Sequence, residues 1–141
     1  MVLGVPEDLA GPTSSARVGW ALEGRYTRRT FVVELGTGAD LHGGDATTAA
    51  IRAVRDCFNH VSLPGLFAVA GLRDPGQMEV EVVLGVPDGL APVDTARVAA
   101  VFPFGRTDIK VQPGGLRVGG GGAREDDFIT VVNAALFVRV P

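Results

Sequence analysis

The sequence lacks the basic patches, the cysteine pairs and the long apolar segments that mark three large classes of protein. Its only lysine is Lys110 and its formal net charge is −3, so no basic stripe can neutralise a run of phosphates. Cys57 is the only cysteine, which excludes an internal disulfide and makes a reducing compartment the default. No segment approaches the roughly 18 consecutive apolar residues of a membrane-spanning helix. We therefore expect a cytoplasmic protein whose partners include neither nucleic acid nor membrane.

The residues that are present are typical of one folded domain. Hydrophobic residues make up 46% of the chain and charged residues 21%, which is too apolar for a disordered chain. Residues 1–30 are rich in Gly, Pro, Ser and Thr and contain one short candidate strand, at residues 16–22. We expect residues 1–30 to form an N-terminal arm. The candidate strand in this arm would be an additional strand of the sheet. We expect residues 31–141 to form a single α/β domain.

The hydrophobic pattern of this domain predicts the element order β-α-β-α-β-β. Asp45 and Asp94 are suited to cap two helices that end near His60 and Phe102. Cys57 lies in the apolar stripe of the first helix, which indicates a buried structural thiol. The glycine-rich stretch 114–122 is predicted to be a flexible hairpin loop. The predicted strands span residues 31–35, 78–84, 109–112 and 129–140. The first of them is predicted to stop at Gly36.

These elements predict a two-layer fold, with a four-stranded mixed sheet and two helices on one face. The last strand is apolar on both of its alternating faces, so both faces of the sheet must be covered. Two helices cover only one face, and a second copy of the chain is the simplest cover for the other. We therefore expect a homo-oligomer that assembles through the open face of the sheet.

A run of motifs resembles the Lin family (Lin zero-five-one-two) of conserved hypothetical bacterial proteins. The resemblance is most specific at residues 34–47, Glu-Leu-Gly-Thr-Gly-Ala-Asp-Leu-His-Gly-Gly-Asp-Ala-Thr, where a strand with a glutamate leads through a glycine turn into a helix. It spans residues 31–141 and implies the fold described above, without a settled reaction. Further similar segments are residues 49–56, 62–65, 84–87, 102–105, 114–116 and 132–135.

The size and element order are also similar to one of the three repeated units in ring-opening amidohydrolases of the cyanuric acid hydrolase and barbiturase type. That resemblance implies a ring of three copies with clefts between subunits, and so favours a trimer with an interfacial site. It does not extend to the chemistry, because those enzymes use pairs of Lys and Ser. Lys110 has no serine near it in the sequence.

The segment Asp40-Leu41-His42-Gly43-Gly44-Asp45 places two carboxylates and an imidazole between a strand and a helix, where α/β proteins commonly bind ligands. Asp40 and His42 could form a general base with its orienting partner. They could instead bind a divalent metal, with Glu34 as a third ligand. In a purely structural alternative, Asp45 caps the helix, Asp40 closes an Asx-turn and His42 donates to a backbone carbonyl.

Other candidates for substrate binding are spread along the chain. Lys110 could anchor an anionic substrate together with Arg106 or Arg124, or could simply be a solvated edge lysine. Asn133, in an otherwise apolar strand, could bind a ligand at a subunit interface or hold a bulge. Glu34 and Asp45 complete the candidate set.

Two functions remain open at this point. The first is a small-molecule enzyme of hydrolase type, acting on a small polar or cyclic amide metabolite at a subunit interface and using Asp40 and His42 for catalysis. The second is a non-catalytic module that binds a small molecule or forms a structural oligomer. A divalent metal is the one cofactor that the residues suggest.

Overall fold

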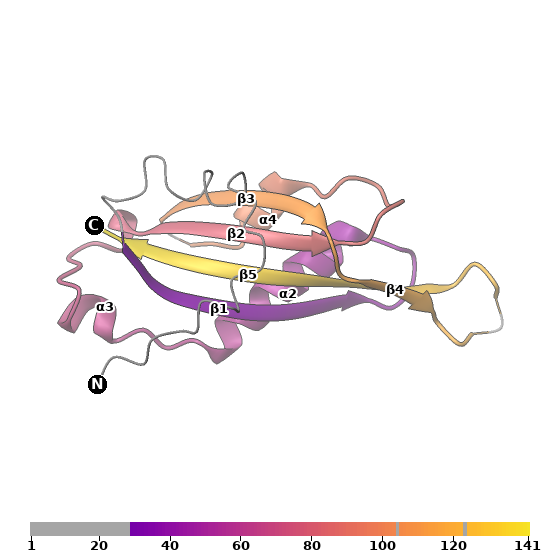
Figure 1. Cartoon of the computed structure of the whole chain (residues 1–141), viewed down its shortest axis with the longest axis horizontal. Helices are drawn as coiled ribbons and strands as arrows, with labels where there is room; N and C mark the ends of the chain where they lie inside the picture. The colour runs from indigo at the N-terminus through magenta and orange to yellow at the C-terminus, as the bar shows by residue number, and fades with distance from the viewer. Residues whose placement is uncertain (1–28, 104, 123) are drawn as a thin grey trace, which may run out of the picture.

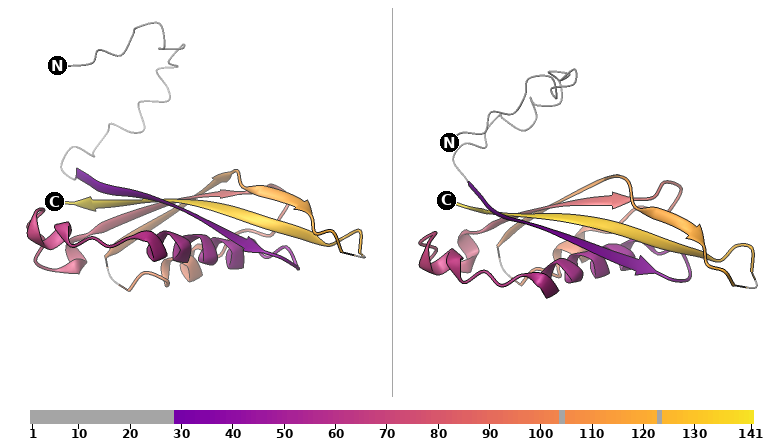
Figure 2. Two further views of the ribbon diagram at one scale, coloured as in Figure 1. Left: turned by 90° about the horizontal axis from the view of Figure 1, so that it is seen from below. Right: turned by 60° about the horizontal axis from the view of Figure 1, so that its bottom comes forward.

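The computed structural model describes residues 29–103, 105–122 and 124–141. Five strands form one sheet, and the helices lie against one face of it (Figures 1 and 2). The predicted strand at residues 16–22 lies outside the described residues. The elements are β1 (Arg29–Asp40), α2 (Ala46–His60), α3 (Gly65–Ala68), the short 3-10 helix η2 (Pro75–Gln77), β2 (Glu79–Val86), α4 (Thr95–Ala99), β3 (Arg106–Pro113), β4 (Leu116–Gly119) and β5 (Phe128–Val140).

The predicted two-layer α/β fold with a mixed sheet is confirmed. Four strands follow the order β1-β5-β2-β3, in which β5 is antiparallel to β1 and β2, while β2 and β3 are parallel. The fifth strand, β4, pairs with the first residues of β5 beyond the point where β2 ends (Figure 1). The sheet is therefore one strand larger than predicted.

The fifth strand corrects the prediction that residues 114–122 form a loop. Gly114 and Gly115 carry the chain closely past Gly85 at the end of β2, and a Cβ at Gly115 would lie only 2.2 Å from the carbonyl oxygen of Val131. Gly115 also has a φ of +68°, a region that glycine adopts without strain. These glycines therefore let the chain pass close to the backbone of β2 and β5, after which it rejoins the sheet as β4.

Strand β1 runs through the glycines at which the sequence pattern predicts a stop. A Cβ at Gly36 would lie 2.3 Å from the carbonyl oxygen of Ala53, and one at Gly38 would lie 2.2 Å from that of Ala49. Both carbonyls belong to α2, so these two residues face the helix and let its backbone approach the sheet closely. The predicted end at Gly36 was wrong because the glycines serve packing and not a turn.

Helix α2 begins and ends as predicted. Asp45 is its N-cap, and its side chain accepts hydrogen bonds from the backbone N–H of Thr48 at 3.0 Å and from the Thr48 hydroxyl at 2.7 Å. Cys57, on the buried face of the helix, is 1% exposed. The second predicted helix is shorter than expected, because α4 ends at Ala99 instead of continuing to Phe102. None of the helices in the described ranges is long and apolar enough to cross a membrane.

The polar face of α2 covers part of the outer edge of β1. The Arg52 guanidinium donates to the carbonyl oxygen of Ala39, and the Asp56 carboxylate accepts from the backbone N–H of Thr37 at 2.9 Å. An edge strand exposes backbone groups that can pair with another chain, and these two side chains occupy such groups. The edge of β1 is therefore closed over its second half.

The other face of the sheet carries two kinds of side chain. Val33 and Leu35 of β1 alternate with the glycines that face α2, so they project from the opposite face, where Leu35 is 68% exposed. On β2 and its neighbours, the buried carboxylate of Glu81 lies 3.3 Å from Lys110 Nζ and 3.0 Å from an Arg139 guanidinium nitrogen. The face is thus apolar toward β1 and ion-paired toward β3.

Candidate functional site

A polar pocket lies where the loop after β1 meets the hairpin of β4 and β5. Its volume is about 500 Å³. The β1 to α2 loop supplies one wall, and the segments on either side of the hairpin turn supply the other. The lining residues are His42, Gly43, Gly44, Arg117, Arg124, Asp126, Asp127 and Phe128.

The pocket contains a histidine paired with a carboxylate. His42 Nδ1 lies 3.1 Å from one carboxylate oxygen of Asp127 and 3.2 Å from the other. The Asp127 side chain is 18% exposed, whereas that of His42 is 78% exposed. A carboxylate at this distance favours the tautomer with the proton on Nδ1, which leaves the Nε2 lone pair free to accept a proton. The pair therefore has the arrangement of a general base and its orienting partner.

Two guanidinium groups border the same pocket. Arg117 lies over the ring of Phe128, with 4.3 Å between its central carbon and the ring centroid. Arg124 donates to both carboxylate oxygens of Asp126, at 3.1 and 3.0 Å, and this hydrogen bonding holds the pKa of Asp126 below its usual value. Guanidinium groups suit carboxylate and phosphate oxygens, and since Arg124 is already paired with Asp126, Arg117 is the group suited to bind an anionic oxygen here.

Asp40 is not the partner of His42. Its carboxylate accepts a hydrogen bond from the backbone N–H of Asp45 at 2.9 Å, and it lies 3.6 Å from an Arg52 guanidinium nitrogen. Asp40 thus fixes the loop that carries His42, in a local role close to the predicted Asx-turn. The structure does not bring Asp40 to His42 as predicted, because one Asp40 oxygen accepts from the N-cap Asp45 and the other faces Arg52, in the middle of α2.

Asp45 has the structural role that the sequence pattern assigned to it. Hydrogen bonds from the Thr48 hydroxyl and from the backbone of Thr48 lower the pKa of the Asp45 carboxyl. The group therefore remains ionised at neutral pH and caps the first turn of α2.

The chain matches a known family over most of its length. Residues 30–138 match the family described as Conserved hypothetical protein (Lin0512_fam). The chain belongs to this family. A similar solved structure is that of an FtsZ-like protein of unknown function from Nostoc punctiforme, with 39% sequence identity and a TM-score of 0.71, over 80% of this chain and 96% of that one. No curated protein matches the chain.

Three predicted site residues of this family member lie away from the pocket. Lys110 lies on the open face of the sheet with Glu81, and Asn133 lies on the same face, where its side-chain oxygen accepts from the Thr37 hydroxyl at 3.3 Å. The pairing of β1 with β5 is regular at Asn133, so this residue holds no bulge. Glu34 lies on the face that carries α2, near enough to Cys57 to influence its pKa.

The described residues contain no group of three or more His, Cys, Asp and Glu side chains that could hold a metal ion. Glu34, Asp40 and His42 are therefore not assembled into the predicted metal site. Asp127, which pairs with His42, is a candidate site residue that the sequence pattern did not single out. No local signal connects it to His42, which lies 85 residues earlier.

Proposed function

We propose that this family member is a cytoplasmic small-molecule enzyme of hydrolase type, in which His42, oriented by Asp127, acts as the general base. The observation that carries the proposal is the hydrogen bond between His42 Nδ1 and the Asp127 carboxylate. The exposure of His42 supports it further, because substrate and water can reach the free Nε2.

In this proposal, Nε2 of His42 removes a proton from a water molecule that attacks the carbonyl carbon of a small polar or cyclic amide. The protonated imidazole is stabilised by the Asp127 carboxylate and then delivers the proton to the leaving nitrogen. Arg117, at the border of the pocket, provides positive charge for the negative charge that develops on the carbonyl oxygen. All of these groups come from one chain, so the pocket does not require a subunit interface.

The alternative is a non-catalytic module that forms a structural oligomer. It is supported by the exposed apolar side chains of Val33 and Leu35 on the open sheet face, which a second copy of the chain would cover. A homo-oligomer, with three copies favoured, is compatible with either function.

The test compares His42→Ala and Asp127→Asn with the unsubstituted protein in hydrolysis of a panel of small linear and cyclic amides, followed by proton NMR. We expect His42→Ala to lower kcat/KM by about 10²- to 10⁴-fold, the usual contribution of a general base. Asp127→Asn should also lower kcat/KM, because an amide cannot hold the imidazole in the same tautomer.

His60→Ala is the matched control, since His60 is an exposed histidine in the last turn of α2 that does not line the pocket. It should leave kcat/KM unchanged. Turnover that survives in His42→Ala, or a panel in which the unsubstituted protein hydrolyses nothing, would favour the non-catalytic alternative. The melting temperature of each variant separates lost chemistry from lost folding.

A further inference from the structure

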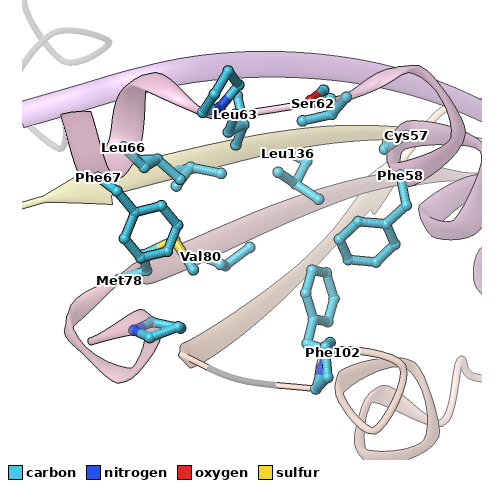
Figure 3. Close-up of a pocket in the computed structure, with 15 residues that line it drawn as sticks. Cys57, Phe58, Ser62, Leu63, Leu66, Phe67, Met78, Val80, Phe102 and Leu136 are labelled. Atoms are coloured by element: carbon cyan, nitrogen blue, oxygen red, sulfur yellow. The ribbon is translucent and has the colours of Figure 1, made fainter. Parts of the chain in front are cut away.

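A second cavity, of about 390 Å³, opens on the helix side of the sheet (Figure 3), and His42 does not line it. It lies between the end of α2, the segment that contains α3, the start of β2 and the residues that follow α4. Its floor is part of the hydrophobic core, since Met78, Val80 and Leu136 are buried and line it.

The cavity exists because the helices are shorter than the sheet that they cover. Helix α2 ends at His60 and α4 at Ala99, while β5 continues to Val140. Over this end of the sheet the cover consists of the four residues of α3, the three of η2 and their connecting loops. Short irregular segments fill space less completely than a long helix, and a gap remains above the core.

Aromatic side chains stand at both ends of the cavity. The rings of Phe58 and Phe102 meet edge to face at one end, with centroids 5.1 Å apart, and Phe67 lies at the other (Figure 3). Phe58 and Phe67 are exposed although they border a core. A flat apolar molecule between them would contact ring faces and edges as a buried aromatic side chain does.

Among the residues that the structure describes, no charged side chain lines the cavity. Its side-chain polar groups are the Ser62 hydroxyl and the Cys57 thiol, and burial raises the pKa of Cys57 to about 11, so the thiol stays neutral at physiological pH. A charged ligand would lose its hydration here without gaining a partner, which is strongly unfavourable. The lining therefore selects against ions.

We propose that this cavity is a binding site for a neutral aromatic small molecule about the size of two fused rings. A dry apolar cavity of roughly 150 Å³ holds one benzene ring, and the volume here is 390 Å³. The site is separate from the pocket of His42 and does not depend on the function proposed for that pocket.

The first test is binding of indole to the full chain, measured by saturation-transfer NMR and calorimetry. Leu63, on the loop after α2, lines the cavity, so the larger ring in Leu63→Trp should fill the space and weaken indole binding about tenfold or more. Val69→Trp is the matched control, because Val69 is 82% exposed and does not line the cavity. Its affinity should equal that of the unsubstituted protein.

A second test uses the unsubstituted protein alone, with Cys57 as its single thiol. Saturating indole should slow the reaction of Cys57 with N-ethylmaleimide severalfold, whereas indole-5-carboxylate, which carries a charge, should not. The proposal is overturned if indole shows no saturable binding, if Leu63→Trp binds it as well as Val69→Trp does, or if both indoles protect Cys57 equally.

Discussion

Burial controls the reactivity of Cys57, although the thiol lines a cavity. Desolvation disfavours the thiolate, and the nearby carboxylates of Asp56 and Glu34 disfavour it further, which together raise the pKa from 9.0 to about 11. The thiolate is the nucleophilic form of cysteine, so a raised pKa lowers reactivity at neutral pH. Cys57 is accordingly a structural residue, as its place in the apolar stripe of α2 predicts.

We expect Cys57 to react slowly with N-ethylmaleimide in the folded protein. Because the pKa of Cys57 is raised from 9.0 to about 11, the thiolate fraction at about pH 8 is about a hundredfold lower than that of an ordinary thiol. The rate should rise about tenfold per pH unit until the pH approaches 11. Intact-mass measurement of the adduct gives the rate, with protein unfolded in urea as the control.

The same shift has a consequence for folding. Below pH 9.0 the thiol is protonated in both states, but between 9.0 and about 11 only the unfolded state releases its proton. Stability should therefore fall as the pH rises through this range. An alkylation profile with its midpoint near 9, equal to that of the unfolded protein, would contradict the burial of Cys57.

At the scale of elements, the contact between α2 and β1 depends on two glycines. The backbone of the helix approaches so closely that a Cβ at Gly38 would lie 2.2 Å both from the carbonyl oxygen of Ala49 and from the backbone nitrogen of Ala53. Backbone atoms cannot move aside as the end of a flexible side chain can. An added methyl group must therefore separate the helix from the strand.

We predict that Gly38→Ala lowers the free energy of unfolding by about 3 kcal/mol, the upper end of the usual overpacking range. Gly119→Ala, in β4, is the matched control, since a Cβ there meets nothing within 4 Å and the residue has no positive φ. Urea denaturation followed by circular dichroism measures both. Equal stability of the two variants would show that α2 does not pack on β1 at this distance.

The outer edge of β1 is partly protected against pairing with another strand. Asp56 and Arg52 bond to the backbone of Thr37 and Ala39, and the ring of Phe31 lies against Gly65 of α3, 3.3 Å from where a Cβ of that glycine would be. Pairing of two sheets edge to edge through β1 is thereby disfavoured. Contact through the open face does not involve this edge, so it is compatible with the protection of β1.

At the scale of the whole molecule, we predict that the chain self-associates through the open face and that three copies form the assembly. Native mass spectrometry of the purified protein should report the trimer. Leu35→Lys should shift it toward monomer, because it places a charge on the apolar part of that face.

Val69→Lys provides the control, since Val69 is still more exposed but lies just after α3 and not on the sheet. It should leave the mass of the assembly unchanged. A monomer in the unsubstituted protein would contradict self-association and the structural-module alternative together. It would not affect the pocket of His42, whose residues all belong to one chain.

The features that the sequence predicts correctly are those that neighbouring residues determine. Asp45 caps α2 by bonding to Thr48, three residues later, and the apolar periodicity of α2 is complete within the helix. The long apolar run at the end of the chain likewise predicts a strand at residues 129–140, and β5 spans Phe128–Val140. Short-range hydrogen bonds and apolar periodicities can be predicted because all of the residues that form them lie within one short segment of the sequence.

The features that only the tertiary structure decides depend on how distant segments pack. His42 meets Asp127 because the β1 to α2 loop and the hairpin before β5 converge, and Asp40 is drawn away by the backbone at the start of α2. The glycines of β1 and those just before β4 look like turn residues in the sequence. In the structure, however, they are required because the backbone of another element lies too close for a side chain. A sequence pattern carries no record of which distant segments come near, and so the local motif around His42 made it a candidate site residue, while nothing local pointed to Asp127.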